Sequence, residues 1–274
     1  MALPSFDRTW RGQQEIRPRI VVLEIRDKAR VEELPLGWVV VEREETYVRN
    51  GDKGEISEAS IRLSYRTITA KRSSYAHGSG QFCGSYSHLF NAVSLTSSSM
   101  AKGAVFLDLP ELRGQRVGTY LMNEIVQWVK QWPEAEVNSI ELLRGQARGD
   151  NKARRNRFYE QFGLCFDYTD SGQREGFSRP MLVKGLSIVD AWEKNIREHR
   201  MFDYLSERMD VLDSVELELG GRKQANAYLK DELNKAESRP LRWALRRFYI
   251  LHSGLMTAGL VLGLFASVCW LKLS

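Results

Sequence analysis

Residues 111–122, ELRGQRVGTYLM, combine two glycines four positions apart with two arginines. They follow an apolar run typical of a strand and precede an apolar pattern with helical spacing. The first backbone N–H groups of a helix have no acceptor within the helix, and the helix dipole favours negative charge there. Gly114 and Gly118 would let a ligand approach the backbone closely. The stretch therefore predicts a site for an anion.

The same stretch also fits an ordinary turn, because glycine is a common turn residue. A nucleoside-triphosphate loop is excluded, since no Gly-Lys-Ser/Thr follows the glycines. The glycine spacing also departs from the dinucleotide-binding pattern. The residues alone leave two interpretations open, an anion site and a plain turn.

A second basic segment, residues 151–164 (NKARRNRFYEQFGL), has the spacing of a helix. Phe158 and Phe162 lie four residues apart, and Tyr159 lies beside their stripe. Positive charge in the first turns opposes the helix dipole, so a nearby anion would relieve an unfavourable arrangement. A solvated basic face is the alternative. No repeated basic stripe or aromatic platform occurs elsewhere, so we expect no nucleic-acid binding.

Together, the two segments resemble the signatures of the GNAT family of acyl-CoA-dependent N-acetyltransferases. The first signature, Arg/Gln-x-x-Gly-x-Gly/Ala, corresponds here to Arg113-Gly-Gln-Arg-Val-Gly118. The second is a helix with Asn, a small residue and Tyr, and it corresponds to residues 151–164. The resemblance covers about residues 103–170. Arg116 replaces the first motif glycine, and a non-glycine residue fits there if its φ is negative.

This resemblance implies that the turn holds the pyrophosphate of acetyl-CoA through backbone N–H groups. Arg116 would add a side-chain contact to a phosphate oxygen. The backbone of Asp108 and Leu109 would bond the pantetheine arm. No metal is implied. The implied cofactor-binding residues are Asp108, Leu109, Arg113, Gly114, Gln115, Arg116, Val117, Gly118, Thr119, Asn151 and Arg155.

The resemblance also implies that an amine, on a protein or a small molecule, attacks the thioester directly. The departing thiolate needs a proton, and Tyr159 stands where the family has its general acid. An ordinary tyrosine has a pKa near 10, so it is protonated at neutral pH and can donate. The candidate bases for the amine proton are Glu141 and Glu111, directly or through water. An ordinary surface carboxylate is the alternative for each.

The secondary-structure pattern predicts an α+β domain with a mixed, mostly antiparallel central sheet flanked by helices. Residues 72–87 are rich in Gly and Ser and predict a loop. Two helices are predicted, over residues 117–132 and from Asn151 to Gly163. The predicted strands cover residues 19–25, 37–48, 59–70, 103–109, 137–147, 164–170 and 179–186.

The chain divides by composition into three parts. We expect a GNAT-like domain over residues 1–186, a charged helical stalk over 187–239 that breaks at Gly220-Gly221, and an anchor over 240–274. Residues 248–271 contain no Asp, Glu, Lys or Arg. As a helix, this run would extend about 36 Å and cross a hydrocarbon core of about 30 Å. A buried core helix is the alternative.

Charge around the apolar run predicts its orientation. Four arginines precede it and a single lysine follows, so the N-terminal side is expected to be cytoplasmic, as in a tail-anchored protein. Gly259 and Gly263 form a Gly-x-x-x-Gly pair that predicts a homodimer contact within the membrane. The four arginines are Arg239, Arg242, Arg246 and Arg247.

The sequence thus predicts an N-acetyltransferase that acts at the cytosolic face of a membrane, with acetyl-CoA as donor and an amine as acceptor. The alternative is a catalytically inactive GNAT-like protein, tethered to the membrane as an acyl-CoA sensor or interaction scaffold. The formal net charge of +5 permits anionic partners without requiring them. Three scattered cysteines fit a reducing compartment.

Overall fold

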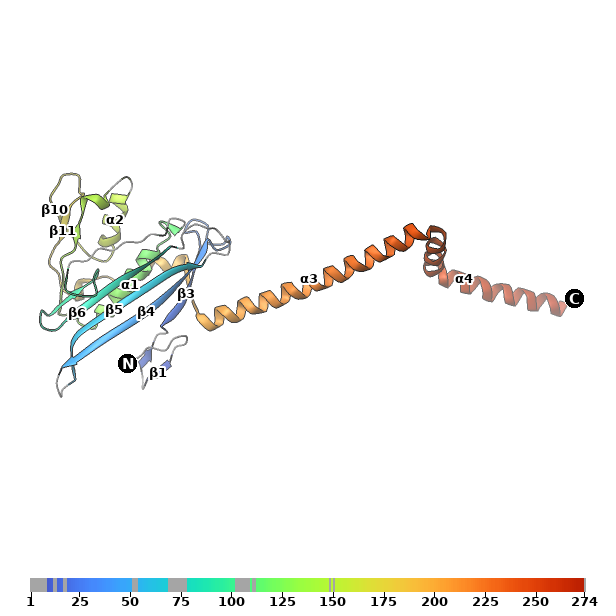
Figure 1. Cartoon of the computed structure of the whole chain (residues 1–274), viewed down its shortest axis with the longest axis horizontal. Coiled ribbons are helices and arrows are strands. Elements are labelled where there is room, and N and C mark those ends of the chain that lie inside the picture. Colours follow the sequence, from blue (N-terminus) through green and yellow to red (C-terminus); the bar gives the residue numbers. More distant parts are fainter. Residues whose placement is uncertain are drawn as a thin grey trace. The chain divides into compact units, whose positions relative to one another are not determined.

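A seven-stranded sheet is the centre of the first of two units, Met1–Ser206 and Glu207–Ser274, in the computed structural model (Figure 1). The structure describes residues 9–11, 14–16, 19–50, 54–68, 78–101, 109, 112–147, 149 and 151–273. Two short strands, β1 (Thr9–Arg11) and β2 (Gln14–Ile16), form a separate antiparallel pair.

The large sheet has the order β12-β3-β4-β5-β6-β7-β8. Every neighbouring pair is antiparallel except β7 and β8, which are parallel. This confirms the α+β class and the mixed, mostly antiparallel sheet. Its strands are β3 (Ile20–Ile25), β4 (Gly37–Asn50), β5 (Glu55–Ile68), β6 (Ser79–Ser87), β7 (Ala92–Ser94), β8 (Glu136–Val137) and β12 (Ile196–Arg200).

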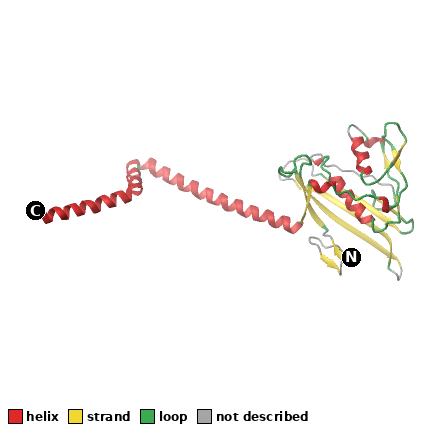
Figure 2. Cartoon of the chain, turned by 180° about the vertical axis from the view of Figure 1, so that it is seen from behind, coloured by secondary structure: helices red, strands yellow, loops and turns green. Residues whose placement is uncertain are grey.

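Helix α1 (Val117–Val129) lies along one face of this sheet, as predicted (Figures 1 and 2). Successive strand side chains point to opposite faces, so alternate residues of β4, β5 and β6 face the helix. Ile61, Leu63 and Phe82 are buried on this face, as are Leu121 and Ile125 of α1. The main hydrophobic core therefore lies between the sheet and α1.

The loop predicted over residues 72–87 is wrong for its second half, because Ser79–Ser87 is strand β6. Residues 72–77 lie outside the described part of the chain. The glycines of β6 are there for packing. A β-carbon added at Gly84 would lie 2.7 Å from Ile125 Cγ2, and one added at Gly80 would lie 2.3 Å from Tyr65 Oη. Glycine is typical of turns, but at these two positions in β6 it lets α1 and the Tyr65 ring approach the strand closely.

The strand predicted over residues 137–147 is split between two sheets. Asn138 N donates to Val93 O (2.8 Å) in the large sheet, whereas Ser178 N donates to Ile140 O (2.9 Å) in a second sheet. That second, antiparallel sheet has the order β10-β11-β9, and a 3₁₀ turn follows at Arg144–Gln146. Its strands are β9 (Glu141–Leu142), β10 (Phe166–Tyr168) and β11 (Gly176–Ser178).

Two other strand predictions have different outcomes. The segment 179–186 is not a strand, since its centre forms a 3₁₀ turn at Val183–Gly185 and the strand lies just before it, in β11. The predicted strand 103–109 lies outside the described residues except for Leu109, which is buried. The predicted second helix is confirmed as α2 (Asn151–Glu160), and Gly163 follows it with a φ of +88°.

The first unit extends past residue 186, where the composition changes. A 3₁₀ turn at Ala191–Lys194 leads into β12, which pairs with β3 along five residues from Ile196 to Arg200. Helix α3 (Met201–Ser238) then runs without interruption. The break predicted at Gly220-Gly221 is wrong. A β-carbon added at either glycine would have no neighbour within 4 Å, so both positions are open and the helix continues through them.

Helix α4 (Pro240–Leu273) has non-helical backbone angles at His252, with φ −114° and ψ 16°. Among the described residues, no single helix has both the length and the apolar character needed to cross a membrane. Two segments bent by 64°, Pro240–Gly254 and Thr257–Val268, meet those criteria only as a pair. The prediction of one uninterrupted membrane helix is therefore not supported.

The close packing at Gly84 generates a stability prediction. Gly84→Val should lower the free energy of unfolding by about 1–3 kcal/mol, because its side chain would overlap Ile125 and the Ser94 carbonyl oxygen. Gly145→Val is the matched control, since no atom lies within 4 Å of its added β-carbon. Urea unfolding followed by tryptophan fluorescence checks both. Equal midpoints for the two variants would show that α1 does not depend on this close approach.

Candidate functional site

The turn before α1 is held in left-handed backbone conformations. Gly114 has a φ of +77°, and Arg116, the N-cap of α1, has a φ of 65° and ψ of 11°. The condition for a non-glycine residue at this motif position, a negative φ, is therefore not met at Arg116. Residues other than glycine adopt this region rarely, so the position needs support from the surrounding structure.

Asn195 gives that support. Its side chain is 1% exposed, and its Nδ2 donates to Gln115 O (3.1 Å) and Arg26 O (3.0 Å). Its Oδ1 accepts from Arg116 Nη1 (2.8 Å). A single buried amide thus ties the turn to the end of β3. Nothing in the local sequence pattern distinguishes Asn195, which lies 79 residues after Arg116, so sequence analysis missed it.

The turn carries concentrated positive charge. Arg113 is exposed, and Lys28 reaches the turn from the loop after β3. A β-carbon added at Gly114 would lie 3.8 Å from Lys28 Nζ, and the Lys28 backbone N donates to Gln115 Oε1 (3.0 Å). The N–H groups of the first turn of α1, from Val117 to Thr119, have no acceptor within the helix. Charge and N–H groups together favour an anion here.

The two sequence segments meet in the structure. Gln161, just after α2, donates from Nε2 to Thr119 Oγ1 in the first turn of α1 (3.2 Å). Thr119 is buried, as is Tyr159 on the last turn of α2. The start of α1 and the end of α2 therefore form one region, which we call the α1–α2 site.

One basic residue of α2, Arg155, packs into the fold, whereas Arg157 is exposed. Arg155 is buried, and its guanidinium donates to Leu143 O (2.8 Å) and Arg174 O (3.0 Å). Burial lowers the pKa of Arg155. Asn151 Nδ2 donates to Gln146 O, and its Oδ1 accepts from Arg154. The side chains of these two predicted cofactor residues thus hold α2 against neighbouring loops.

Tyr159 lies among aromatic rings. The ring centroids of Phe158 and Phe166 are 5.0 and 5.7 Å from its own. Burial raises the pKa of Tyr159 to about 12, although the nearby Arg155 cation lowers it. The phenol is therefore neutral at physiological pH and keeps a proton to donate.

Of the two candidate bases, the structure describes only Glu141. Glu141 is half-buried on β9, where its backbone pairs with Phe177 of β11. It is two residues before Leu143, whose carbonyl accepts from Arg155, so Glu141 belongs to the substructure that supports α2. Glu111 and Asp108 lie outside the described residues.

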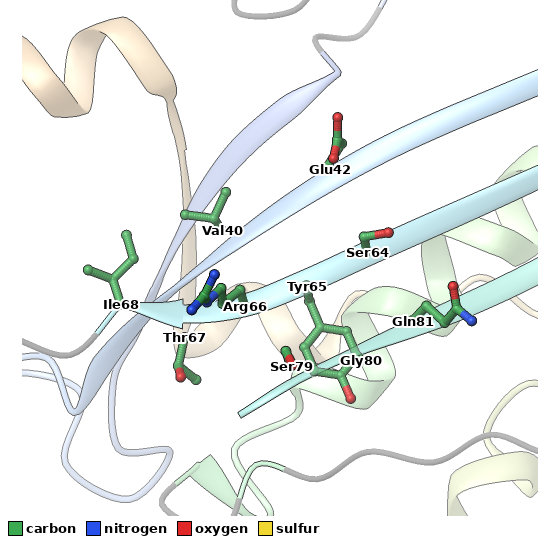
Figure 3. A pocket seen from close by; sticks show the side chains of 10 residues that line it. All are labelled: Val40, Glu42, Ser64, Tyr65, Arg66, Thr67, Ile68, Ser79, Gly80 and Gln81. Atoms are coloured by element: carbon green, nitrogen blue, oxygen red, sulfur yellow. The ribbon is translucent and has the colours of Figure 1, made fainter. Parts of the chain in front are cut away.

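A separate cavity of about 800 Å³ lies over β4, β5 and β6 (Figure 3). Arg66 and Gln81 are exposed there, and Arg19 Nε donates to Glu42 Oε1 (2.8 Å) beside it. No motif in the sequence indicates this cavity. It is lined by Val40, Glu42, Ser64, Tyr65, Arg66, Thr67, Ile68, Ser79, Gly80 and Gln81.

The α1–α2 site thus brings together the N–H groups and basic side chains at the start of α1 and the buried, neutral phenol of Tyr159 on α2. Within the described ranges, no three or more His, Cys, Asp or Glu side chains are grouped to hold a metal ion. The chain matches no protein-family model, no curated protein and no solved structure.

Proposed function

We propose that the first unit binds acetyl-CoA at the α1–α2 site and transfers the acetyl group to an amine, as a GNAT-like N-acetyltransferase. The observation that carries this proposal is the Gln161–Thr119 hydrogen bond of 3.2 Å. It joins two segments that the sequence separates by about 40 residues and that carry the anion site and the proton donor, respectively. The finer GNAT-like fold is part of the same proposal.

The residues of the turn fit a pyrophosphate. The N–H groups of Val117, Gly118 and Thr119 would receive it at the helix N-terminus, with Arg113 and Lys28 supplying positive charge. The Arg116 guanidinium already bonds Asn195, and its remaining N–H donors are the ones available for the predicted phosphate contact. Gly114 is exposed and Gln115 half-buried beside them, and the backbone of the buried Leu109 would bond the pantetheine arm.

Acetyl-CoA supplies an activated acetyl thioester when bound. In the proposed reaction the acceptor nitrogen forms a bond to the carbonyl carbon, and the bond from that carbon to sulfur breaks. Tyr159 would donate its phenolic proton to the departing sulfur, and its pKa of about 12 means that the phenol is protonated at neutral pH. Glu141 or Glu111 would take the proton that the amine loses, directly or through a water molecule.

A specific observation favours the alternative, a sensor or scaffold without turnover. Three of the residues assigned to cofactor binding, Arg116, Asn151 and Arg155, use their side chains for contacts within the fold. Binding of acetyl-CoA without release of free thiol would support this alternative over the enzyme.

We also propose that α4 attaches the chain to a membrane. Its apolar segment follows Arg239, Arg242, Arg246 and Arg247, which favours a cytoplasmic location for the first unit. Gly259 and Gly263 lie one helical turn apart, and no atom lies within 4 Å of a β-carbon added at either. They therefore suit a homodimer contact between two copies of α4.

The anion site predicts the effect of a charge reversal. Arg113→Glu should weaken acetyl-CoA binding at least about tenfold, equivalent to about 1.4 kcal/mol, because the turn would repel phosphate. Isothermal titration calorimetry measures this. Arg66→Glu is the matched control, since it makes the same charge change on the sheet face away from α1 and should leave affinity unchanged. Equal losses of affinity in both variants would mean that acetyl-CoA binds elsewhere, or that it is attracted only by the general positive charge.

The proton-donor role predicts a selective loss of turnover. Tyr159→Phe should lower kcat by about 10²-fold or more with little change in acetyl-CoA affinity, since only the hydroxyl is removed. Thiol release in the presence of primary amines and lysine peptides measures kcat. In the parent, kcat should not fall through Tyr159 ionisation until the pH approaches about 12. Tyr168→Phe should behave as the parent, and full turnover by Tyr159→Phe would remove that hydroxyl from the mechanism.

The membrane proposal predicts protection of the first unit. Protease added to sealed, right-side-out spheroplasts should leave residues 1–206 intact, and lysis should make them accessible. Immunoblotting with an antibody to the first unit measures the surviving fragment. Digestion before lysis would mean the opposite orientation, and recovery of the chain in the supernatant after cell breakage would contradict membrane attachment.

A further inference from the structure

Helix α3 exposes an apolar stripe along most of its 38 residues. Leucines occur at every seventh position, Leu205, Leu212, Leu219 and Leu233, and Asn226 takes the one intervening position in the series. Exposure of these leucines ranges from 47% to 62%. A helix with such a stripe normally buries it against another element.

We propose that α3 pairs with α3 of a second copy of this chain as a parallel, in-register, two-stranded coiled coil. The leucine series spans four heptads, the length over which a coiled-coil repeat is normally sustained, and arginines interrupt the apolar residues at two of the d positions. With the leucines at heptad position a, position d carries Arg208, Val215, Arg222, Leu229 and Ala236. This surface is separate from Gly259 and Gly263 of α4.

Asn226 favours a second copy of α3 as the partner and a parallel orientation of the two helices. In a parallel, in-register pair, the two Asn226 side chains meet and their amides can hydrogen-bond each other. In an antiparallel pair, position a of one helix lies beside position d of the other, so the two Asn226 side chains would not meet. A single asparagine at position a is the device that sets register and two-strand pairing in parallel coiled coils.

Of the charge pairs that flank the seam, one is attractive in this arrangement, and one, Glu232 at position g opposite Glu237 at position e, is repulsive. Glu218 at position g would face Lys223 at position e of the second helix, which is an attractive pair. Arg222 lies at a d position, but its Nη2 donates to Glu218 Oε1 of the same helix (2.6 Å), which draws the guanidinium towards the edge of the seam. Its alkyl stem can then cover the neighbouring leucines.

The unpaired helix also has a weak centre that pairing would stabilise. Gly220 and Gly221 occupy positions b and c, away from the seam, and glycine is among the least favourable helix residues. No residue of α3, all of which the structure describes, is buried in the single chain. Burial of Leu219 before the glycines, and of Leu229 and Leu233 after them, would hold the helix together through this region.

The oligomeric state of the full chain, purified in mild detergent, tests the proposal by analytical ultracentrifugation. The parent should sediment as a dimer at micromolar concentration, and the double variant Leu212→Lys, Leu219→Lys should sediment as a monomer. Leu217→Lys, Gln224→Lys adds the same charge at two f positions and should remain dimeric. A monomeric parent would overturn the proposal, as would a dimer that survives the seam lysines and is lost in Gly259→Ile.

Cysteine cross-linking tests direction and register. In a background with Cys83, Cys165 and Cys269 changed to Ser, Asn226→Cys should form a disulfide-linked dimer at least about tenfold faster than Gln224→Cys, because only position 226 meets its own copy. Mild oxidation followed by non-reducing electrophoresis measures both rates. Equal rates, or no cross-link at position 226 in a dimeric protein, would overturn the parallel, in-register arrangement.

Discussion

The contact between α1 and β6 at Gly84 is the constraint on which the rest of the first unit depends. The helix can approach the sheet there only because the strand has no side chain, with Ile125 filling the space that a β-carbon would need. Interiors are packed densely, so a shift of one helix moves every group attached to it. The position of α1 on the sheet therefore determines where its first turn, with Val117, Gly118 and Thr119, is presented.

Buried polar side chains hold the turn before α1, and α2, in place through hydrogen bonds. Asn195 bonds the turn before α1, and Arg155 bonds two carbonyl oxygens around α2. A buried polar group without a partner is costly, so each such network fits only one arrangement of the chain. A further network joins the middle of α1 to the sheet, where Arg43 pairs with both Glu45 and Glu124. These contacts explain how a turn with a left-handed arginine persists beside a short, strongly basic helix.

The proposed chemistry depends on two different environments, one at the charged turn before α1 and one around Tyr159. Positive charge collects at the exposed turn, whereas Tyr159 is enclosed by aromatic rings and keeps its proton. An anion and a proton donor need these opposite environments, one polar and one apolar, within reach of each other. The Gln161–Thr119 hydrogen bond links the residue just after α2 to the first turn of α1.

The sequence by itself determined the α+β class, the strands β3, β4 and β5, both helices of the α1–α2 site and the uncharged run in α4, because each follows from local periodicity or composition. Tertiary structure alone decided that Ser79–Ser87 is a strand, that residues 136–142 divide between two sheets, and that α3 continues through Gly220-Gly221. It also decided the roles of Asn195, Arg116 and Arg155. The physical reason is that a glycine or a polar side chain takes its role from the atoms that approach it, and those atoms come from distant parts of the chain.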